Sequence, residues 1–588
     1  MRLPLRRCFP AGLWSRTTVR LWLCLLAVIL WFDIEWCLAT TFTAFSMPET
    51  WVNTLLLSLL LSMPQMLWHK GRLQSTVTLL AAVWFECNLM YSRTYFAAIP
   101  LGSYAMAGNL ADFTASVADS LRPLDAVFML PVAASFLIAR RKQTPRPAGA
   151  ALPYFVYFVI LSAISGLLLA RRGGLTKAWS TLANANYHSC RVPMYTLVGS
   201  LVNDAATATA PLSDADRAET ERWLAKQRTL APHPDSTGRD NIVWILCESL
   251  ESWPIGLTVQ GKEITPCLNR LVSDTTTLYA PHVVSQVGAG RSIDAQLLIN
   301  AGMLPMLTGV YATDRPGNTY HTLTKAFAAA RSTRSYLLTV DKPSTWNQEA
   351  VARAFGIDTI IARDSWVNDE KVGSRKKLGD RSFARQIAEK MRSGEIWPDG
   401  EHAFVQIVTY SGHNPFILPE TLDNLRLDRD KLPATVANYL TMTHYTDAAI
   451  GLLVDCMRSR PDFARTMIVI TGDHEGLAAE RPALNAACSY VSPHQEVPLI
   501  VVNSPAGGTH EAVMGQVDIY PTLLDLAGID SPWRGMGRSI LDPSFPGVAV
   551  GSQLDIRGDS TALSADELQH IKDARKTSDR IIIYNLLH

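Results

Sequence analysis

The stretch Asn241-Ile-Val-Trp-Ile-Leu-Cys-Glu248 is a short, continuous apolar run that ends in a carboxylate. Two later stretches, Val405-Gln-Ile-Val-Thr-Tyr-Ser-Gly-His413 and Met467-Ile-Val-Ile-Thr-Gly-Asp473-His474, have the same form. Short apolar runs of this kind are typical of strands in a parallel sheet that is covered on both faces. Together they predict an α/β sheet whose strands carry ionisable side chains just beyond their carboxyl ends.

Short β-rich runs and helical segments alternate from residue 241 onward. The further β-rich runs cover 335–340, 359–362 and 498–502. The helical segments lie near 321–331, 381–392, 433–458 and 511–527. Such alternation argues for a mostly parallel sheet with helices on both faces. In sheets of this class, ligands bind beyond the carboxyl ends of the strands.

The chain upstream of this region is dominated by apolar runs. Charged residues make up only 18% of the 588 residues, below the roughly 25% of an ordinary soluble protein. Five apolar runs approach the length, about 20 residues, that spans a bilayer as a helix. They cover 21–38, 51–68, 73–91, 124–139 and 152–170. A signal peptide has one such run, so we expect a five-helix transmembrane domain over 1–172.

The distribution of basic residues predicts the orientation of these spans. Basic residues gather before the first run, between the second and third, and between the fourth and fifth: Arg2, Arg6, Arg7, Arg16, Arg20, Lys70, Arg72, Arg140, Arg141, Lys142 and Arg146. Such clusters stay on the cytoplasmic side. We therefore expect the N-terminus inside and everything after residue 170 outside, although Arg171 and Arg172 depart from the rule.

The remaining domain boundaries follow from composition. Residues 173–239 have the pattern of a linker with an amphipathic helix, for which Ser213 is a suitable N-cap. We expect a catalytic domain over 240–545 and a C-terminal tail, 546–588, that packs on it. With 54 basic and 53 acidic residues, the net charge of +1 gives no support to a nucleic-acid partner.

The strand-end residues combine into a chemically coherent set. Glu248, Asp473 and His474 supply two carboxylates and an imidazole, which suit one divalent Mn, Zn or Mg ion. The loop Gly288-Ala-Gly-Arg-Ser292 brings a hydroxyl to the expected start of a helix. Metal coordination would lower the pKa of the Ser292 hydroxyl and make it a nucleophile. Arg291 and the loop N–H groups would hold an anionic phosphate beside it; the alternative for Ser292 is a simple helix cap.

Four motifs and a following helix occur in order along the chain. They are Cys-Glu248-Ser-Leu-Glu-Ser, Gly-Arg-Ser292-Ile-Asp294, Ser411-Gly-His413-Asn-Pro-Phe416, Gly472-Asp473-His474-Glu-Gly476 and Gln516-Val-Asp-Ile-Tyr-Pro-Thr-Leu-Leu-Asp-Leu-Ala-Gly. Together they resemble the lipoteichoic acid synthase-like and phosphoethanolamine transferase-like branch of the sulfatase/alkaline phosphatase superfamily. Five spans and an outer catalytic domain are also that branch's architecture. The resemblance implies that Glu248, Ser292, Asp473 and His474 bind one divalent metal ion and that Ser292 is the nucleophile.

The resemblance also implies substrate contacts. His413 would meet the substrate phosphate, and Trp346 matches a tryptophan that contacts the headgroup. His494 would be a phosphate contact, a contact behind the metal ligands, or a surface histidine. The branch commonly has Arg where Gln348 stands, which disfavours a phosphoglycerol headgroup and favours phosphoethanolamine. Ser292 is followed by Ile-Asp-Ala-Gln, not by the signature of a sulfatase that forms formylglycine.

We therefore expect a membrane-bound, metal-dependent phosphotransferase. A phospholipid would donate phosphoethanolamine or phosphoglycerol through a phospho-serine at Ser292 to a hydroxyl of an envelope glycan or lipid. The protein would be multi-pass in a bacterial cytoplasmic (inner) membrane, with its catalytic domain in the periplasm. The alternatives are a phosphodiesterase or phosphatase on the same site, a non-catalytic membrane scaffold, and lipid transport by the spans.

Overall fold

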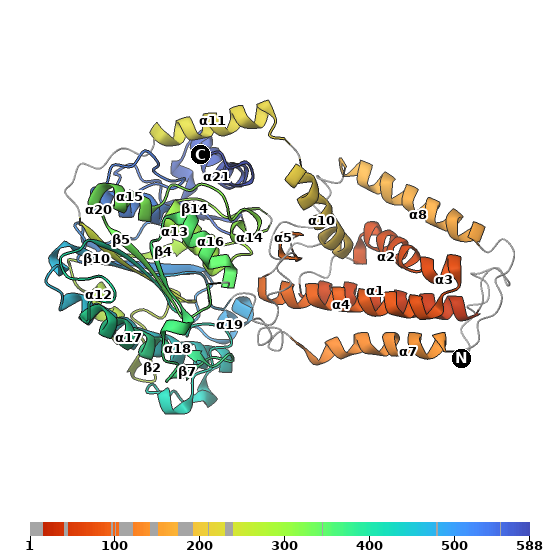
Figure 1. Ribbon diagram of the computed structural model, residues 1–588, viewed down its shortest axis with the longest axis horizontal. Coiled ribbons are helices and arrows are strands. Elements are labelled where there is room, and N and C mark those ends of the chain that lie inside the picture. Colours follow the sequence, from red (N-terminus) through yellow and green to blue (C-terminus); the bar gives the residue numbers. More distant parts are fainter. Residues whose placement is uncertain are drawn as a thin grey trace. The chain divides into compact units, whose positions relative to one another are not determined.

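The computed structural model describes 16–39, 45–95, 98–99, 101–104, 121–140, 151–174, 192–209, 211–229 and 239–587, apart from 308, 344, 478–479 and 553. The chain forms two compact units, Met1–Ala210 and Pro211–His588 (Figure 1). Most of the N-terminal arginines, most of the basic loop after residue 140 and most of the expected hinge at 231–240 lie outside the described residues.

The first unit is helical. Its helices are α1 (Arg16–Ala39), α2 (Pro48–Leu61), α3 (Met63–Trp68), α4 (Gly71–Tyr95), α5 (Leu101–Tyr104), the 3-10 helix η4 (Pro123–Phe128), α7 (Met129–Ala139), α8 (Ala151–Arg171) and α10 (Pro193–Thr209). All five predicted apolar runs are helical. The second run is divided at Ser62, because the following helix begins with Pro64 at its first turn, where a proline fits best.

Five membrane-spanning helices were expected, but not all of the five helical segments have the length and apolar composition of a span. Among the described residues, Thr17–Leu38 and Ala151–Arg171 are long and apolar enough to cross a membrane. Pro123–Ala139 is apolar but shorter, α2 has 14 residues, and α4 is less apolar because it carries polar residues. The coarser prediction of an N-terminal apolar helical region is confirmed.

Charged side chains are buried inside this helical unit. Arg93 on α4 lies 3.2 Å from Glu35 on α1 and 2.7 Å from Asp125 on η4, and all three side chains are at most 6% exposed. Asp33 accepts a hydrogen bond of 2.6 Å from Thr54 Oγ1. These carboxylates therefore have partners within the unit, as charged groups in a membrane protein require.

The second unit is built on a nine-stranded sheet with the strand order β12-β4-β11-β10-β1-β9-β5-β6, and β13 pairs with β4. Its strands are β1 (Asn241–Cys247), β4 (Leu278–Val284), β5 (Arg334–Thr339), β6 (Thr359–Ile361), β9 (Ala403–Val408), β10 (Thr466–Gly472), β11 (Glu496–Val502), β12 (Gly508–Thr509) and β13 (Met514–Gly515). The core β10-β1-β9-β5-β6 is parallel, and β11 runs antiparallel to β10 and β4. The predicted mostly parallel α/β sheet is confirmed, and the sequence did not reveal β4, β12 and β13.

Helices cover both faces of the sheet, with α17 and α18 on one side and α13 and α20 on the other (Figure 1). The helices and turns are α11 (Asp214–Thr229), α12 (Pro266–Val272), α13 (Ser292–Ala301), α14 (Tyr311–Asp314), α15 (Leu323–Arg331), η6 (Thr345–Asn347), α16 (Gln348–Phe355), η7 (Arg363–Ser365), α17 (Asp380–Arg392), η8 (Glu420–Leu422), η9 (Arg429–Lys431), α18 (Ala434–Arg458), η10 (Phe463–Arg465), α19 (Arg481–Ala487), η12 (Gln516–Asp518), α20 (Ile519–Ala527), η13 (Ser560–Ala562) and α21 (Ala565–Tyr584). Two-stranded pairs are β2 (Thr258–Val259) with β3 (Lys262–Glu263), β7 (Lys371–Val372) with β8 (Lys377–Leu378), and β14 (Val548–Val550) with β15 (Ile556–Gly558). Successive residues of β1 pack alternately into the two cores, which explains its continuous apolar sequence.

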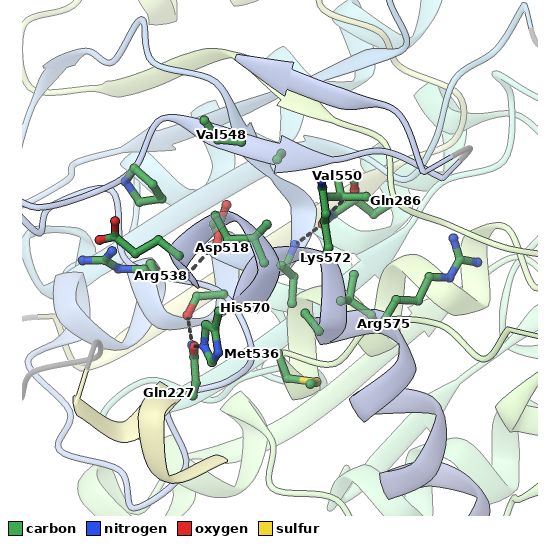
Figure 2. A pocket seen from close by; sticks show the side chains of 18 of the residues that line it. Gln227, Gln286, Asp518, Met536, Arg538, Val548, Val550, His570, Lys572 and Arg575 are labelled. Atoms are coloured by element: carbon green, nitrogen blue, oxygen red, sulfur yellow. Dashed lines mark hydrogen bonds between the residues drawn. The ribbon is translucent and has the colours of Figure 1, made fainter. Parts of the chain in front are cut away.

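The helix α11, expected within the linker, packs against the C-terminal helix α21. Trp223 stacks on His570 with ring centroids 4.4 Å apart, and its indole N–H donates to the His570 carbonyl at 2.9 Å. The His570 Nε2 lies 2.9 Å from Gln227 Oε1. Figure 2 labels both residues. A cavity of about 70 Å³ lies between these helices and β14. The Ser213 hydroxyl accepts from the Asp216 N–H at 3.1 Å, which confirms the predicted N-cap.

Candidate active site

The register of the parallel strands places the strand-end residues in one row. Leu246 on β1 is level with Val408 on β9, and Val408 is level with Thr339 on β5. Two residues further on, Glu248, Tyr410 and Asp341 follow these strands at the same edge of the sheet. On the other side of β1, Cys247 pairs with Gly472, so Asp473 follows beside Glu248. Adjacent strands lie about 4.8 Å apart, which gathers these side chains at the carboxyl edge.

Glu248, Asp473 and His474 form a tight cluster at this edge. One ligand atom of each lies within 4.8 Å of the others. His474 Nε2 is 3.6 Å from Glu248 Oε1 and 3.4 Å from Asp473 Oδ2, and the three side chains are at most 9% exposed. The structure therefore brings together the three residues that the sequence proposed as metal ligands.

Ser292 joins this cluster as the first residue of α13. Its Oγ lies 3.3 Å from Glu248 Oε2 and 3.4 Å from His474 Nε2. The preceding residue, Arg291, has a φ of 50°, which costs conformational energy for a residue with a side chain and recurs at functional sites. The hydroxyl is thus held at the edge of the proposed metal site by a strained turn.

The chemistry of the donor set fits a divalent cation. Burial, followed by the nearby Asp473 carboxylate, raises the pKa of Glu248 to about 7, because two buried carboxylates in contact disfavour the ionised form. A bound cation would offset that repulsion. On His474, Nδ1 lies 3.0 Å from the Glu475 carbonyl oxygen. The other ring nitrogen, Nε2, faces the cluster, as a histidine that ligates a metal ion requires.

The sequence suggested that N–H groups of the glycine loop hold a phosphate, but two of them are engaged within the protein. The N–H groups of Gly288 and Gly290 both donate to Asp294 Oδ2 at 2.9 Å. Burial raises the pKa of Asp294 to about 6, and these two hydrogen bonds act in the opposite direction. Asp294 therefore fixes the loop that leads to Ser292, which is why the two amides are already engaged.

The Arg291 side chain likewise pairs with groups of the same chain. Its Nη1 donates to Glu475 Oε1 at 2.5 Å, and its Nη2 donates to the Glu475 carbonyl at 3.0 Å. Although burial opposes it, this guanidinium lowers the pKa of Glu475 to about 2. Arg291 Nη2 also lies 2.9 Å from His474 Nδ1. The side chain predicted to contact the substrate phosphate thus braces His474 from behind.

Two glycines allow the strand ends to approach each other closely. A Cβ on Gly472 would lie 1.9 Å from the Leu250 carbonyl oxygen, and one on Gly412 would lie 2.0 Å from the Glu248 carbonyl oxygen. Both distances are far below any real Cβ contact. Gly472 and Gly412 directly precede Asp473 and His413, so each glycine positions a residue of the site.

His413 follows β9 and stacks on Tyr410 with ring centroids 5.6 Å apart. Its Nδ1 lies 2.7 Å from the Asn414 carbonyl oxygen, so Nδ1 carries the proton and Nε2 is an acceptor. Burial, and then the positive charge of Arg375, lowers the pKa of His413 to about 4. A neutral imidazole with a free Nε2 is suited to accept a proton from a hydroxyl group.

Trp346, Gln348 and His494 lie on three other segments of the second unit. Trp346 lies in the turn η6 with a φ of 53° and packs partly against the core. His494 is exposed in the loop before β11. Gln348 is 8% exposed, and its amide pairs with that of Gln296 at 3.1 Å in both directions. Gln348 therefore belongs to a buried amide pair.

Three further residues were missed by the sequence argument. Glu475 follows the Asp-His pair directly, and Asp341 follows β5, so the rule of strand ends already contained a signal for both. Lys377 begins the short strand β8 and contacts Asp341 through its ammonium. Nothing in a lysine-rich hairpin sequence distinguishes this lysine from its neighbours, because only the fold brings it to the row.

The comparisons with known proteins agree with this geometry. The Sulfatase family model matches residues 240–529. A curated relative, lipoteichoic acid synthase of Staphylococcus aureus, is 24% identical over 470 residues, covering 76% of this chain and 70% of the relative.

Two solved structures share the fold. A lipoteichoic acid synthase of Listeria monocytogenes has a TM-score of 0.52 at 17% identity, covering 65% of this chain and 98% of that one. The integral membrane protein lipooligosaccharide phosphoethanolamine transferase A of Neisseria meningitidis has a TM-score of 0.52 at 12% identity, covering 87% of this chain and 95% of that one. The second likeness extends over much of the helical unit as well.

Proposed function

Because residues 240–529 form a domain of the sulfatase family, within the sulfatase/alkaline phosphatase superfamily, we propose that the protein is a membrane-bound, metal-dependent phosphotransferase. It moves the headgroup of a phospholipid, phosphoglycerol or phosphoethanolamine, to a hydroxyl of an envelope glycan or lipid. The names of the relatives, a lipoteichoic acid synthase and a phosphoethanolamine transferase, support this reaction class. The observation that carries the proposal is the contact of the Ser292 hydroxyl with both Glu248 and His474.

The membrane attachment is part of the proposal. We infer that the five apolar helical segments span a bacterial cytoplasmic membrane and that residues 240–545 act outside it. Large apolar side chains on α7 and α8 are 50% or more exposed: Met129, Leu130, Leu137, Leu152, Phe155, Val159 and Leu167. Such surfaces suit lipid rather than water. A membrane-held enzyme stays close to a lipid donor.

Glu248, Asp473, His474 and Ser292 would hold one divalent Mn, Zn or Mg ion. When bound, such an ion supplies positive charge that lowers the pKa of the serine hydroxyl. The Ser292 oxygen then attacks phosphorus and displaces diacylglycerol, whose oxygen takes up the proton that the serine loses; the headgroup phosphate stays on Ser292. Arg291 and Glu475 hold the His474 ring in place during this step.

The second half of the reaction regenerates the serine. The acceptor hydroxyl gives its proton to His413 Nε2, which is free to accept because Nδ1 donates to Asn414. Its oxygen attacks the phosphorus and the bond to Ser292 Oγ breaks; the serine oxygen regains a proton and His413 loses the one that it accepted. The low pKa of His413, about 4, keeps the imidazole neutral and ready at neutral pH. Water in place of the acceptor would give hydrolysis on the same site.

The phospho-serine is tested by mass spectrometry of the purified protein after incubation with a divalent metal and phospholipid. We expect the mass of one phospho-headgroup on Ser292 in the wild type. Ser292→Ala should lose diacylglycerol release by orders of magnitude with little change in melting temperature, and Ser292→Thr should keep some activity. Wild-type rates in Ser292→Ala would refute the serine nucleophile, and product release that never requires an acceptor would identify a hydrolase.

A further inference from the structure

Lys377 reaches into the row of strand-end residues from the β7–β8 hairpin. Its ammonium contacts Asp341 Oδ1, and the side chain is only 12% exposed. The same ammonium lies 4.2 Å from the centre of the Tyr410 ring. Asp341 and Tyr410 follow the neighbouring strands β5 and β9 at the same level, and Tyr410 stacks on His413.

A carboxylate and an aromatic ring face are the groups with which proteins hold an organic ammonium ion. At this edge of the sheet, both are already engaged by Lys377. Burial lowers the pKa of Lys377, while Asp341 and, more weakly, Glu248 oppose that shift. The protein therefore places its own cation where the ammonium of a bound headgroup would otherwise find partners.

Other carboxylates around the cluster are engaged as well. Glu475 pairs with Arg291 at 2.5 Å. Glu251 pairs with Arg481 at 2.6 Å. Arg375, on the same hairpin as Lys377, adds a positive charge near His413. Glu475 and Glu251 thus each already have a cationic partner within the protein.

We propose that Lys377 determines headgroup specificity: through its contacts with Asp341 and Tyr410 it excludes an ammonium-bearing headgroup and leaves the site to an uncharged polyol phosphate. This inference rests on the proposed transferase function. It also replaces the expectation drawn from Gln348, since that amide is buried against Gln296 and does not open room for an ammonium.

The physical basis is the cost of bringing two like charges together. An ammonium of the substrate would either meet Lys377 directly or have to displace it from Asp341. Like-charge contacts in a desolvated interface cost several kcal/mol, so the preference for an uncharged headgroup should be at least about tenfold. The hydroxyl groups of a polyol can instead accept from Lys377 and donate to Asp341.

The test compares binding of sn-glycerol phosphate and phosphoethanolamine to the full chain in detergent, with a divalent metal present, by calorimetry. The wild type should prefer glycerol phosphate by about tenfold or more, and Lys377→Met should lose that preference. Lys377→Arg keeps the charge and should keep the preference. Lys376→Met, on the exposed neighbouring lysine, is the matched control and should behave as the wild type.

Turnover of phosphatidylglycerol and phosphatidylethanolamine vesicles is measured in parallel. If neither lipid modifies Ser292, the proposed transferase function fails, but the binding ratio still decides the role of Lys377. A wild type that prefers phosphoethanolamine, or a Lys377→Met variant with unchanged preference, overturns the inference. Lys377→Gln, which retains a hydrogen-bond donor to Asp341, replaces Lys377→Met if that variant does not fold.

Discussion

Gly472 is the residue whose small size matters most for the geometry of the site. It pairs with Cys247 in the sheet and directly precedes Asp473. The Leu250 carbonyl oxygen occupies the space that a side chain would need, and a Val497 methyl group lies 3.0 Å from the same point. Since the obstacle is backbone, it cannot move aside by a change of rotamer.

We expect Gly472→Ala to destabilise the protein by about 1–3 kcal/mol, as overpacked sites do, and to displace Asp473. Thermal unfolding and metal content measure the two effects. Gly317→Ala is the control, because a Cβ there meets nothing within 4 Å. Equal melting temperatures for the two variants would contradict the steric argument.

Asp473 presents one oxygen to the protein and the other to the cluster. Its Oδ1 accepts from the N–H groups of Ser249 and His474, each at 2.7 Å. Oδ2 faces His474 Nε2 at 3.4 Å. The first pair of hydrogen bonds fixes the carboxylate, and the second oxygen is left for a cation.

Asp473→Asn should therefore lose most bound metal while the fold persists. Removing one of two carboxylates halves the negative charge available to a divalent ion, and affinity depends on that charge. Elemental analysis of the purified full chain measures the loss. Asp364→Asn, at a side chain that is 98% exposed, should retain wild-type metal content; full occupancy in Asp473→Asn would remove this residue from the ligand set.

At the scale of elements, the helix pair α11 and α21 shows how distant segments complete the domain. Trp223 and His570 are stacked and buried, and Gln227 bonds to the imidazole. Lys576 and Arg580 on α21 pair with Glu219 on α11. Asp579 on α21 accepts from the Leu307 N–H at 2.9 Å, which attaches the C-terminal helix to the chain that follows α13.

This helix pair should be sensitive to acid. Burial, and then Lys226, lowers the pKa of His570 from 6.5 to about 4. The unfolded chain takes up a proton at higher pH than the folded chain, so the contribution to stability is complete above pH 6.5 and is lost as the pH falls toward 4. Hydrogen exchange of 214–229, corrected for intrinsic rates, should show falling protection over this window. In His570→Gln that dependence should flatten; an unchanged profile would exclude His570 as its cause.

At the scale of the whole molecule, an apolar helical unit precedes an α/β unit with polar chemistry at one sheet edge. The paired charges Arg93, Glu35 and Asp125 lie toward those ends of their helices that the basic-residue pattern assigns to the outer side. Both features support the proposal that the α/β unit acts outside the membrane.

We expect a reporter fused after Gly174 to be active only outside the cytoplasmic membrane, because the basic loops stay inside. A fusion after Lys70, between the second and third helical segments, should be active only inside. Alkaline phosphatase and green fluorescent protein fusions at both positions measure this. Cytoplasmic activity after Gly174 would mean that the number of spans is even.

The sequence by itself determined the α/β class, six of the sheet's strands, and the cluster of Glu248, Asp473, His474 and Ser292. For Glu248, Asp473 and His474 it could do so because a buried parallel strand needs a continuous apolar run, and because parallel strands end at one edge, so residues after such runs must meet. Ser292 begins a helix and was identified by its glycine loop and by the family resemblance. The local pattern of apolar runs therefore predicted which distant residues meet at the sheet edge.

The tertiary structure alone decided the partners of these residues. Arg291 donates to Glu475, the Gly288 N–H donates to Asp294, and Gln348 pairs with Gln296. Each choice depends on which groups the fold brings within about 3 Å, a distance that no spacing along the chain encodes. Lys377 meets Asp341 for the same reason: a hairpin and a strand end become neighbours only when the sheet is assembled.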